Sequence, residues 1–235
     1  MRQRKVKHLE EKLQAVSEYL VEDPSPEIWA QVFGARGTAA GGRPLFLEIG
    51  CGKGDFLLQQ ALAHPEADFV GIEGQASVVL RALEKTAAAA DTAAAGGGTS
   101  LCAGCGFRGN LRFACAFVNG LEELFAPGSL SGIYLNFSDP WPKGRHAKRR
   151  LTWRGRLMDY AKALKPGGFI AVKTDNDPLF DFTLEEIAAC GWKPVEETRD
   201  LHGADCDLEA RLVTTEYERK FRDAGRKINY VKVII

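Results

Sequence analysis

The feature that most constrains the fold is a short apolar segment that runs into closely spaced glycines and then into a helical pattern. Residues 45–49 (LFLEI) predict a buried strand, Gly50, Gly52 and Gly54 follow it, and residues 55–64 (DFLLQQALAH) predict a helix. Strand, glycine loop and helix form the first unit of a nucleotide-binding α/β fold, where small residues let the backbone approach a ligand. A doubly wound domain that binds no nucleotide is the alternative.

Two acidic residues indicate which ligand this unit suits. Glu48 lies just before the glycine loop, where it would repel a pyrophosphate but would suit an ammonium or sulfonium group. A second predicted strand, residues 68–72, ends at Glu73, at about the distance expected of an acid that binds ribose hydroxyls. The G-x-G-x-G spacing also differs from the dinucleotide pattern G-x-G-x-x-G. These features favour S-adenosylmethionine over NAD.

Strand and helix signals alternate along the rest of the chain. Further strands are predicted at 111–118, 132–137, 169–173, 191–197 and 229–235, and helices at 5–21, 78–90, 121–125, 151–164, 179–190 and from 214. This alternation predicts an α/β architecture with a mostly parallel sheet. Asn119, at the end of the predicted third strand, suits an adenine edge, although a simple turn asparagine is the alternative.

The expected domains are an N-terminal basic amphipathic helix and loop, residues 1–42, and a main domain, residues 43–235. The N-terminal helix either touches nucleic-acid backbone or packs on the domain. Residues 87–110 are rich in alanine and glycine and predict a frayed helix end followed by a surface insert. Cys102 and Cys105 have half of a zinc-ribbon spacing, but no second pair follows, so no metal site is predicted.

Residues 136–150 (NFSDPWPKGRHAKRR) carry the most unusual pattern. An apolar strand signal stops at Asp139-Pro140, which places a carboxylate after a strand because the residue before a proline is disfavoured in helices. Trp141 and a second proline stiffen the loop. Six basic residues follow: Lys143, Arg145, His146, Lys148, Arg149 and Arg150. A carboxylate beside an aromatic ring and cations suits a nucleobase on a phosphate chain. The alternative is a loop Asp, a core Trp and a solvated basic helix start.

Charge and composition limit the classes of partner that the protein is expected to bind. Lysine plus arginine and aspartate plus glutamate both number 31 in the 235 residues, so the formal net charge is zero. Any contact with nucleic acid must therefore come from a local cluster. No segment resembles a signal peptide or a membrane span, and the scattered cysteines suggest reduced thiols, so we expect a cytoplasmic protein with no membrane contact.

With these motifs placed, the chain resembles the bacterial-type tRNA (guanine-N7)-methyltransferase family. The matching stretches are LEIGCGKGDFL (47–57), GIE (71–73), FSDPWPKGRHAKRRL (137–151), KTDN (173–176) and TTEYERK (214–220). The resemblance implies a class I S-adenosylmethionine-dependent methyltransferase fold, a Rossmann-like sheet of seven strands with an antiparallel last hairpin and helices on both faces. It also implies methylation of N7 of a guanine in the variable loop of tRNA, position 46.

The resemblance assigns roles to individual positions. Asp139 takes the catalytic position, and the cofactor positions are Glu48, Gly50, Gly52, Gly54, Glu73, Asn119 and Asp139. The tRNA positions are Lys143, Arg145, Arg149, Asp175, Thr215, Tyr217 and Glu218. Asn119 departs from the aspartate that many members carry, which changes a charged adenine contact to a neutral one. The expected partner is tRNA, with a monomer or homodimer and no obligatory protein partner.

Guanine N7 has an in-plane lone pair and no proton, so the reaction needs alignment and no general base. The product guanine becomes cationic, and Asp139 would either stabilise that charge or fix the base through its N–H donors; the sequence leaves both roles open. Two other functions are weighed. Asp-Pro-Trp is similar to the loop of enzymes that methylate exocyclic amines, and a non-catalytic RNA-binding protein could keep a vestigial cofactor fold.

Overall fold

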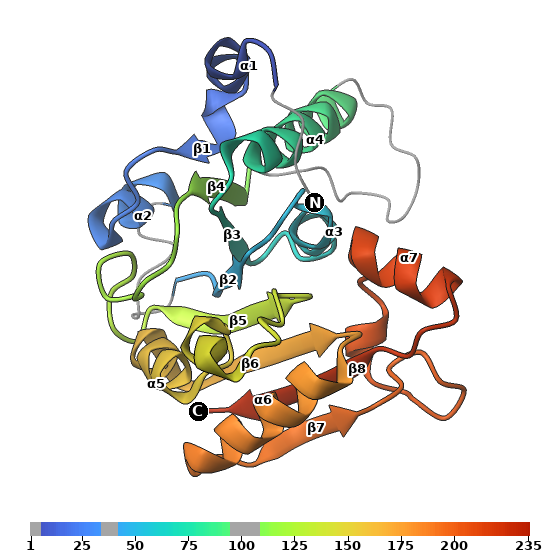
Figure 1. The fold of residues 1–235 in the computed structure, drawn as a ribbon. Helices are drawn as coiled ribbons and strands as arrows, with labels where there is room; N and C mark the ends of the chain where they lie inside the picture. The colour runs from blue at the N-terminus through green and yellow to red at the C-terminus, as the bar shows by residue number, and fades with distance from the viewer. Residues whose placement is uncertain (1–5, 34–41, 95–108) are drawn as a thin grey trace.

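A single eight-stranded sheet organises the chain (Figure 1). The computed structural model describes residues 6–33, 42–94 and 109–235. The strands are β1 (Leu20–Val21), β2 (Leu45–Ile49), β3 (Asp68–Glu73), β4 (Leu111–Cys115), β5 (Leu130–Asn136), β6 (Leu164–Thr174), β7 (Pro194–Thr198) and β8 (Asn229–Ile234). Their order is β1-β4-β3-β2-β5-β6-β8-β7.

The direction of the strands confirms the predicted α/β class. The pairings from β1 to β6 are parallel, and β8 is antiparallel to both β6 and β7. The strand order reverses between β2 and β5, so loops diverge there at the carboxyl edge, where ligands of such sheets bind. The antiparallel last hairpin is as expected. The sheet has one strand more than the expected seven because the two-residue β1 joins its edge.

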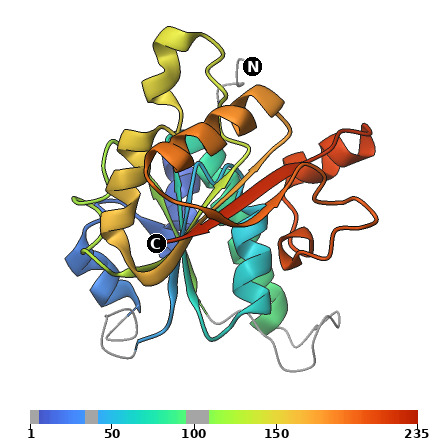
Figure 2. The same cartoon turned by 90° about the horizontal axis from the view of Figure 1, so that it is seen from below.

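Helices cover both faces of the sheet, which Figure 2 shows nearly edge-on. They are α1 (Leu9–Ala15), α2 (Pro26–Phe33), α3 (Asp55–Ala63), α4 (Ala76–Ala94), α5 (Arg154–Ala163), α6 (Asp177–Ala189) and α7 (Glu216–Asp223). The described residues also contain the short 3₁₀ helices η1 (Ser17–Tyr19), η3 (Gly144–Arg149) and η4 (Glu209–Arg211). One buried cluster joins α2, α5 and α6 to the sheet, and a second joins α1, α3 and α4 to its other face.

The N-terminal region differs from the prediction. The helical pattern over 5–21 yields only α1, and the chain then turns through η1 into β1. Val21 pairs with Ala114 of β4 and is 7% exposed, so tertiary pairing overrides the helical spacing. The expected loop before Pro44 contains α2, whose Trp29 stacks on Phe125 with ring centroids 5.7 Å apart.

The helix predicted at 121–125 is wrong. Leu121 and Phe125 are both buried, which produces the helix-like spacing, but the segment makes only one hydrogen-bonded turn. The backbone N–H of Leu121 donates instead to Asp159 Oδ2 at 2.9 Å. A carboxylate from α5 therefore takes the donor that a helix would leave free at its first turn.

Part of the sequence lies outside the described residues. Cys102, Cys105, most of the insert and the basic residues before position 6 belong to it. Residues 87–94 continue α4. In the described part of the chain, no helix is long and apolar enough to cross a membrane, and no three His, Cys, Asp or Glu side chains form a group that could hold a metal ion.

Candidate functional site

The glycine loop turns the chain sharply from β2 into α3. Gly50, Gly52 and Gly54 have φ angles of 75°, 56° and 74°, which residues with side chains rarely adopt. A Cβ at Gly50 or Gly52 would meet nothing within 4 Å, so their backbone borders open space. A Cβ at Gly54 would lie 2.8 Å from Ala82 Cβ. Two glycines therefore expose backbone to a ligand, and the third lets the loop pack on α4.

Glu48 is a buried carboxyl group with one free oxygen. It lies in β2 between β3 and β5, and it is 2% exposed. Its Oε1 accepts a hydrogen bond from Asn136 Nδ2 at 2.8 Å, whereas Oε2 has no partner in the described structure. Burial raises the pKa of Glu48 to about 8. Glu48 lines the cavity described next, so a cationic ligand there could satisfy the free oxygen.

The cavity lies between the glycine loop and the segment that leads into α7. It is lined by Glu48, Gly50, Cys51, Gly52, Lys53, Asp55, Asn136, Phe137, Thr215, Glu216 and Tyr217. Its walls therefore come from β2, from the end of β5 and from residues far along the chain. The structure brings the predicted cofactor residues at 48–52 together with the predicted tRNA residues Thr215 and Tyr217.

Glu73 at the end of β3 faces the same loop. Its Oε2 accepts from the backbone N–H of Gly52 at 3.3 Å, and its Oε1 accepts from that of Gln75 at 3.0 Å. These bonds hold a carboxylate at the carboxyl edge of the sheet beside the glycine loop. The position and the acceptor type suit the hydroxyl groups of a ribose, as the spacing predicts.

Asp139 is exposed, in the loop that follows β5. It lies three residues beyond the last strand residue, Asn136, and not at the strand end itself. Arg150 fixes this loop, since its guanidinium donates to the backbone oxygens of Pro140 at 3.0 Å and Trp141 at 3.1 Å. The Asp139 carboxylate is therefore accessible while its backbone is held.

The basic run divides into two groups. Lys143, Arg145, Lys148 and Arg149 are exposed on and beside η3. Arg150 is half-buried, with its guanidinium carbon 4.2 Å from the Phe182 ring centroid. The guanidinium carbon of Arg149 lies 4.9 Å from the centroid of Trp141. The exposed cations are free to meet phosphates, whereas Arg150 supports the loop.

Asn119, Asp175 and Glu218 are among the predicted residues that do not line the Glu48 cavity. Asn119 is exposed and lines a second cavity, between its own loop and α5, together with Trp153 and Arg156. Asp175 follows β6, and its Oδ2 accepts from the Arg226 guanidinium at 2.8 Å. Glu218, by contrast, has no exposed surface. Its carboxylate bonds to protein groups, so it is not placed to touch a large ligand directly.

Three residues with structural or binding roles escape the sequence analysis. Asn136 holds Glu48, and Lys173 holds Glu218 at 3.1 Å. The sequence signal for Lys173 is its place at the end of the apolar run FIAVK, because a lysine in a buried strand needs a partner for its charge. Phe117 is 79% exposed yet packs on Gly74, where an added Cβ would lie 2.4 Å from its ring. It thus presents an aromatic surface next to Glu73.

Comparisons with known proteins agree with this geometry. A family model described as "Putative methyltransferase" matches residues 42–231. The chain is 43% identical to the tRNA (guanine-N(7)-)-methyltransferase of Mesoplasma florum over 82% of this chain and 81% of that protein. The enzyme of the same name from Lachnoclostridium phytofermentans is 38% identical over 92% and 90% of the two chains.

Solved structures show the same fold at lower identity. The 16S rRNA methyltransferase KamB superposes with a TM-score of 0.58 at 15% identity, over 90% of this chain and 94% of that chain. The 16S rRNA (adenine(1408)-N(1))-methyltransferase from Catenulisporales acidiphilia gives a TM-score of 0.53 at 18% identity, over 91% and 94%. On the sequence similarity over most of its length, this chain belongs to the tRNA (guanine-N7)-methyltransferase family.

Proposed function

We propose that the protein transfers a methyl group from S-adenosylmethionine to N7 of a guanine in tRNA, at position 46 of the variable loop. The observation that carries this proposal is the exposed Asp139 carboxylate at the carboxyl edge of the sheet, in a loop that Arg150 holds through the backbone oxygens of Pro140 and Trp141 and that exposed cations follow. The names of the relatives, tRNA (guanine-N(7)-)-methyltransferase, support the same substrate and the same reaction.

The residues of the Glu48 cavity fit S-adenosylmethionine. The free Oε2 of Glu48 suits the positive methionine part of the cofactor, and the open backbone at Gly50 and Gly52 allows close approach. Glu73 suits the ribose hydroxyls. Outside this cavity, Phe117 and Asn119 follow β4 and suit the face and the edge of an adenine. When bound, the cofactor supplies an electrophilic methyl group to a neutral nucleophile.

The protein then has to position the guanine. N7 carries no proton, so Asp139 need not act as a base, and its charge or its hydrogen bonds act on the purine that becomes cationic. Tyr217 is 57% exposed at the mouth of the cavity and would cover the face of an unstacked base. Lys143, Arg145 and Arg149 would hold the tRNA backbone and set its register without reading sequence.

The direct test is methyl transfer from labelled cofactor to bulk tRNA. The label is expected in a nucleoside at which borohydride and aniline cleave the chain, the behaviour of 7-methylguanosine. Label that resists this cleavage and lies on an exocyclic amine would contradict the proposal and favour the alternative suggested by Asp-Pro-Trp. Absence of transfer with a folded, cofactor-binding protein would favour a non-catalytic RNA-binding role.

Cofactor affinity is expected to rise with pH up to about 8. Burial raises the pKa of Glu48 to about 8; the hydrogen bond from Asn136 and the charge of Lys173 oppose this, and Asp55 and Glu73 add to it. The free protein therefore holds a proton below that pH, and a cationic ligand displaces it. The association constant should increase up to ~10-fold per pH unit between about pH 6 and pH 7.5.

Calorimetry in two buffers of different ionisation enthalpy would detect the released proton. Glu48→Gln provides the control, because an amide does not titrate and its weaker binding should be nearly independent of pH. A parent protein whose affinity does not change with pH would show that Glu48 is already ionised before the cofactor binds.

Removing exposed cations near Asp139 is expected to weaken tRNA binding and its dependence on salt. Each phosphate that the Arg145→Ala/Arg149→Ala variant no longer neutralises should lower the log–log slope of affinity against salt by somewhat under ~1. The matched control is Lys165→Ala/Lys193→Ala, which removes two exposed charges at the starts of β6 and β7, at the opposite edge of the sheet. Equal slopes in both variants would place the tRNA elsewhere.

A further inference from the structure

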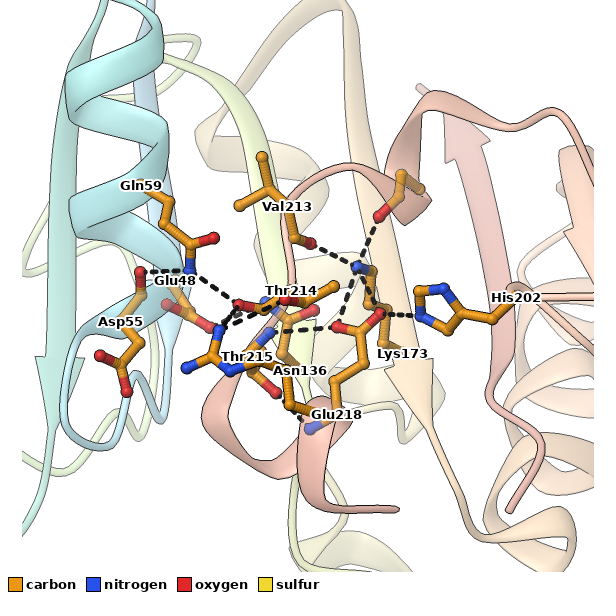
Figure 3. A network of polar contacts seen from close by, with 12 residues as sticks. Glu48, Asp55, Gln59, Asn136, Lys173, His202, Val213, Thr214, Thr215 and Glu218 are labelled. Atoms are coloured by element: carbon orange, nitrogen blue, oxygen red, sulfur yellow. Dashed lines mark hydrogen bonds and ion pairs between the residues drawn. The ribbon is translucent and has the colours of Figure 1, made fainter. Parts of the chain in front are cut away.

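A buried ammonium group organises residues 210–218, the segment that includes the cavity-lining residues Thr215, Glu216 and Tyr217. Lys173 lies near the end of β6 and its side chain is 3% exposed. Its Nζ donates to the backbone oxygens of Ala210 at 2.6 Å and Val213 at 2.9 Å, and to the Glu218 carboxylate at 3.1 and 3.2 Å (Figure 3). One cation thus binds three points of the segment that connects η4 to α7.

Glu218 completes this arrangement from the first turn of α7. Its Oε2 accepts from the backbone N–H of Thr215 at 3.2 Å, and its own N–H donates to Thr215 Oγ1 at 2.9 Å. These two bonds form a capping box that fixes where α7 begins. With Lys173 on the same carboxylate and no exposed surface, Glu218 has no atom left to offer to an RNA base.

His202 contacts the same carboxylate from another side. Its Nε2 lies 2.7 Å from Glu218 Oε1, and its side chain is 13% exposed. The neighbouring Leu201 is fully buried, and its N–H donates to the backbone oxygen of Ile228 at 2.8 Å, just before β8. The imidazole is therefore anchored to the sheet, and Nε2–H donates to a carboxylate that Lys173 already holds.

The segment fixed in this way also reaches the glycine loop. Gln59 of α3 donates to the backbone oxygen of Thr214 at 2.8 Å, and Lys53 pairs with Glu216 at 2.7 Å. Thr215, Glu216 and Tyr217 line the cavity opposite Glu48. Lys173 of β6 and His202 hold these residues through Glu218. Gln59 of α3 holds them through the backbone oxygen of Thr214.

We propose that His202, Lys173 and Glu218 form a positioning cluster that fixes the Thr215–Tyr217 segment above the cofactor cavity, so that Glu218 acts on the tRNA through this segment and His202 contributes to methyl transfer without touching either substrate. The proposal rests on the proposed function, and it changes the role of Glu218 from a direct tRNA contact to a positioning residue. Of the three tRNA positions that the resemblance gives for residues 215–218, Thr215 and Tyr217 are then left to meet the base.

His202 gives the test, because its removal leaves the Lys173–Glu218 pair in place. His202→Ala is expected to lower kcat/KM for tRNA by about tenfold, the effect of removing one hydrogen bond to a charged group. The dissociation constant of S-adenosylmethionine should stay within about twofold of the parent. His202→Gln should restore most of kcat/KM, since the amide nitrogen of glutamine can occupy the place of Nε2. The matched control is His64→Ala, which removes an exposed histidine paired with Glu66.

The assays are run well below the melting temperature of each variant, so that a lower stability alone does not change the rate. A parent-like kcat/KM in His202→Ala would overturn the proposal, as would a glutamine variant as impaired as the alanine one. A double-mutant cycle with Glu218→Gln should show strongly non-additive losses, and additive losses would separate the two residues. The unsubstituted protein is assayed alongside the variants. If it does not methylate tRNA, the proposed function itself is refuted, and this result is distinct from a failure of the positioning cluster.

Discussion

Replacing Asp139 by alanine is expected to lower turnover by ~10²-fold or more, the order of the loss when one preorganised electrostatic group is removed. The side chain is exposed and follows β5 by three residues, so it contributes little to the core, and the free energy of unfolding should fall by no more than ~1–2 kcal/mol. Single-turnover methylation with tRNA and cofactor saturating measures the chemical step.

Asp139→Asn separates the two roles that the structure leaves to this carboxylate. An amide still accepts a hydrogen bond from guanine but cannot neutralise a cation, so recovery of most of the rate would assign Asp139 to positioning. A rate as low as that of Asp139→Ala would assign it to charge stabilisation. Asp91→Ala removes an exposed carboxylate near the end of α4 and is the control. Near-parental rates in both Asp139 variants would remove it from the mechanism.

Replacing Lys173 by methionine is expected to produce the largest loss of stability, ~3–5 kcal/mol. Methionine fills a similar volume but leaves the fully buried Glu218 carboxylate without its cation, and the backbone oxygens of Ala210 and Val213 without their donor. Urea unfolding followed by circular dichroism measures the change. Residues 210–218 should loosen first, because Lys173 binds three of them, Ala210, Val213 and Glu218.

Two further variants check that the charge pair causes this loss. Lys173→Met/Glu218→Gln removes both charges and should be less destabilised than the sum of the single variants. Lys53→Met breaks the exposed pair with Glu216, in which both side chains are 48% exposed, and should cost at most ~1 kcal/mol. A loss in Lys173→Met no larger than that of Lys53→Met would contradict a dominant role for the buried pair.

The sequence predicts the sheet well because strand signals are local. Leu45–Ile49 and the glycines that follow it specify β2 and its turn, and the structure confirms both, with positive φ angles at all three glycines. The α/β class and the antiparallel end also agree with expectation. The helix over residues 5–21 fails because Val21 pairs with β4, more than ninety residues away, and no local spacing records that contact.

The candidate site is predictable to a similar degree. Glu48 and Glu73 lie at adjacent strand ends, and the topology brings them to one edge, as their spacing suggests. The roles of Asn136, Lys173 and His202 depend on contacts between segments distant in the chain, at 2.8, 3.1 and 2.7 Å from their carboxylate partners. Resemblance points to Glu218, but only the structure shows that its carboxylate is buried and bonded to Lys173, His202 and Thr215.

Asp139 lies between two aromatic residues, Phe137 and Trp141, whose φ angles are 52° and 41°. Bulky side chains disfavour this left-handed conformation by ~1–3 kcal/mol, so it persists only because the surrounding structure enforces it. Arg150 supplies part of that enforcement through Pro140 and Trp141. The conformational entropy of ordering the loop backbone that carries the carboxylate is therefore lost once, when the chain folds, and not again with each tRNA that arrives. A relaxed loop would fold with less strain but would have to be ordered in every catalytic cycle.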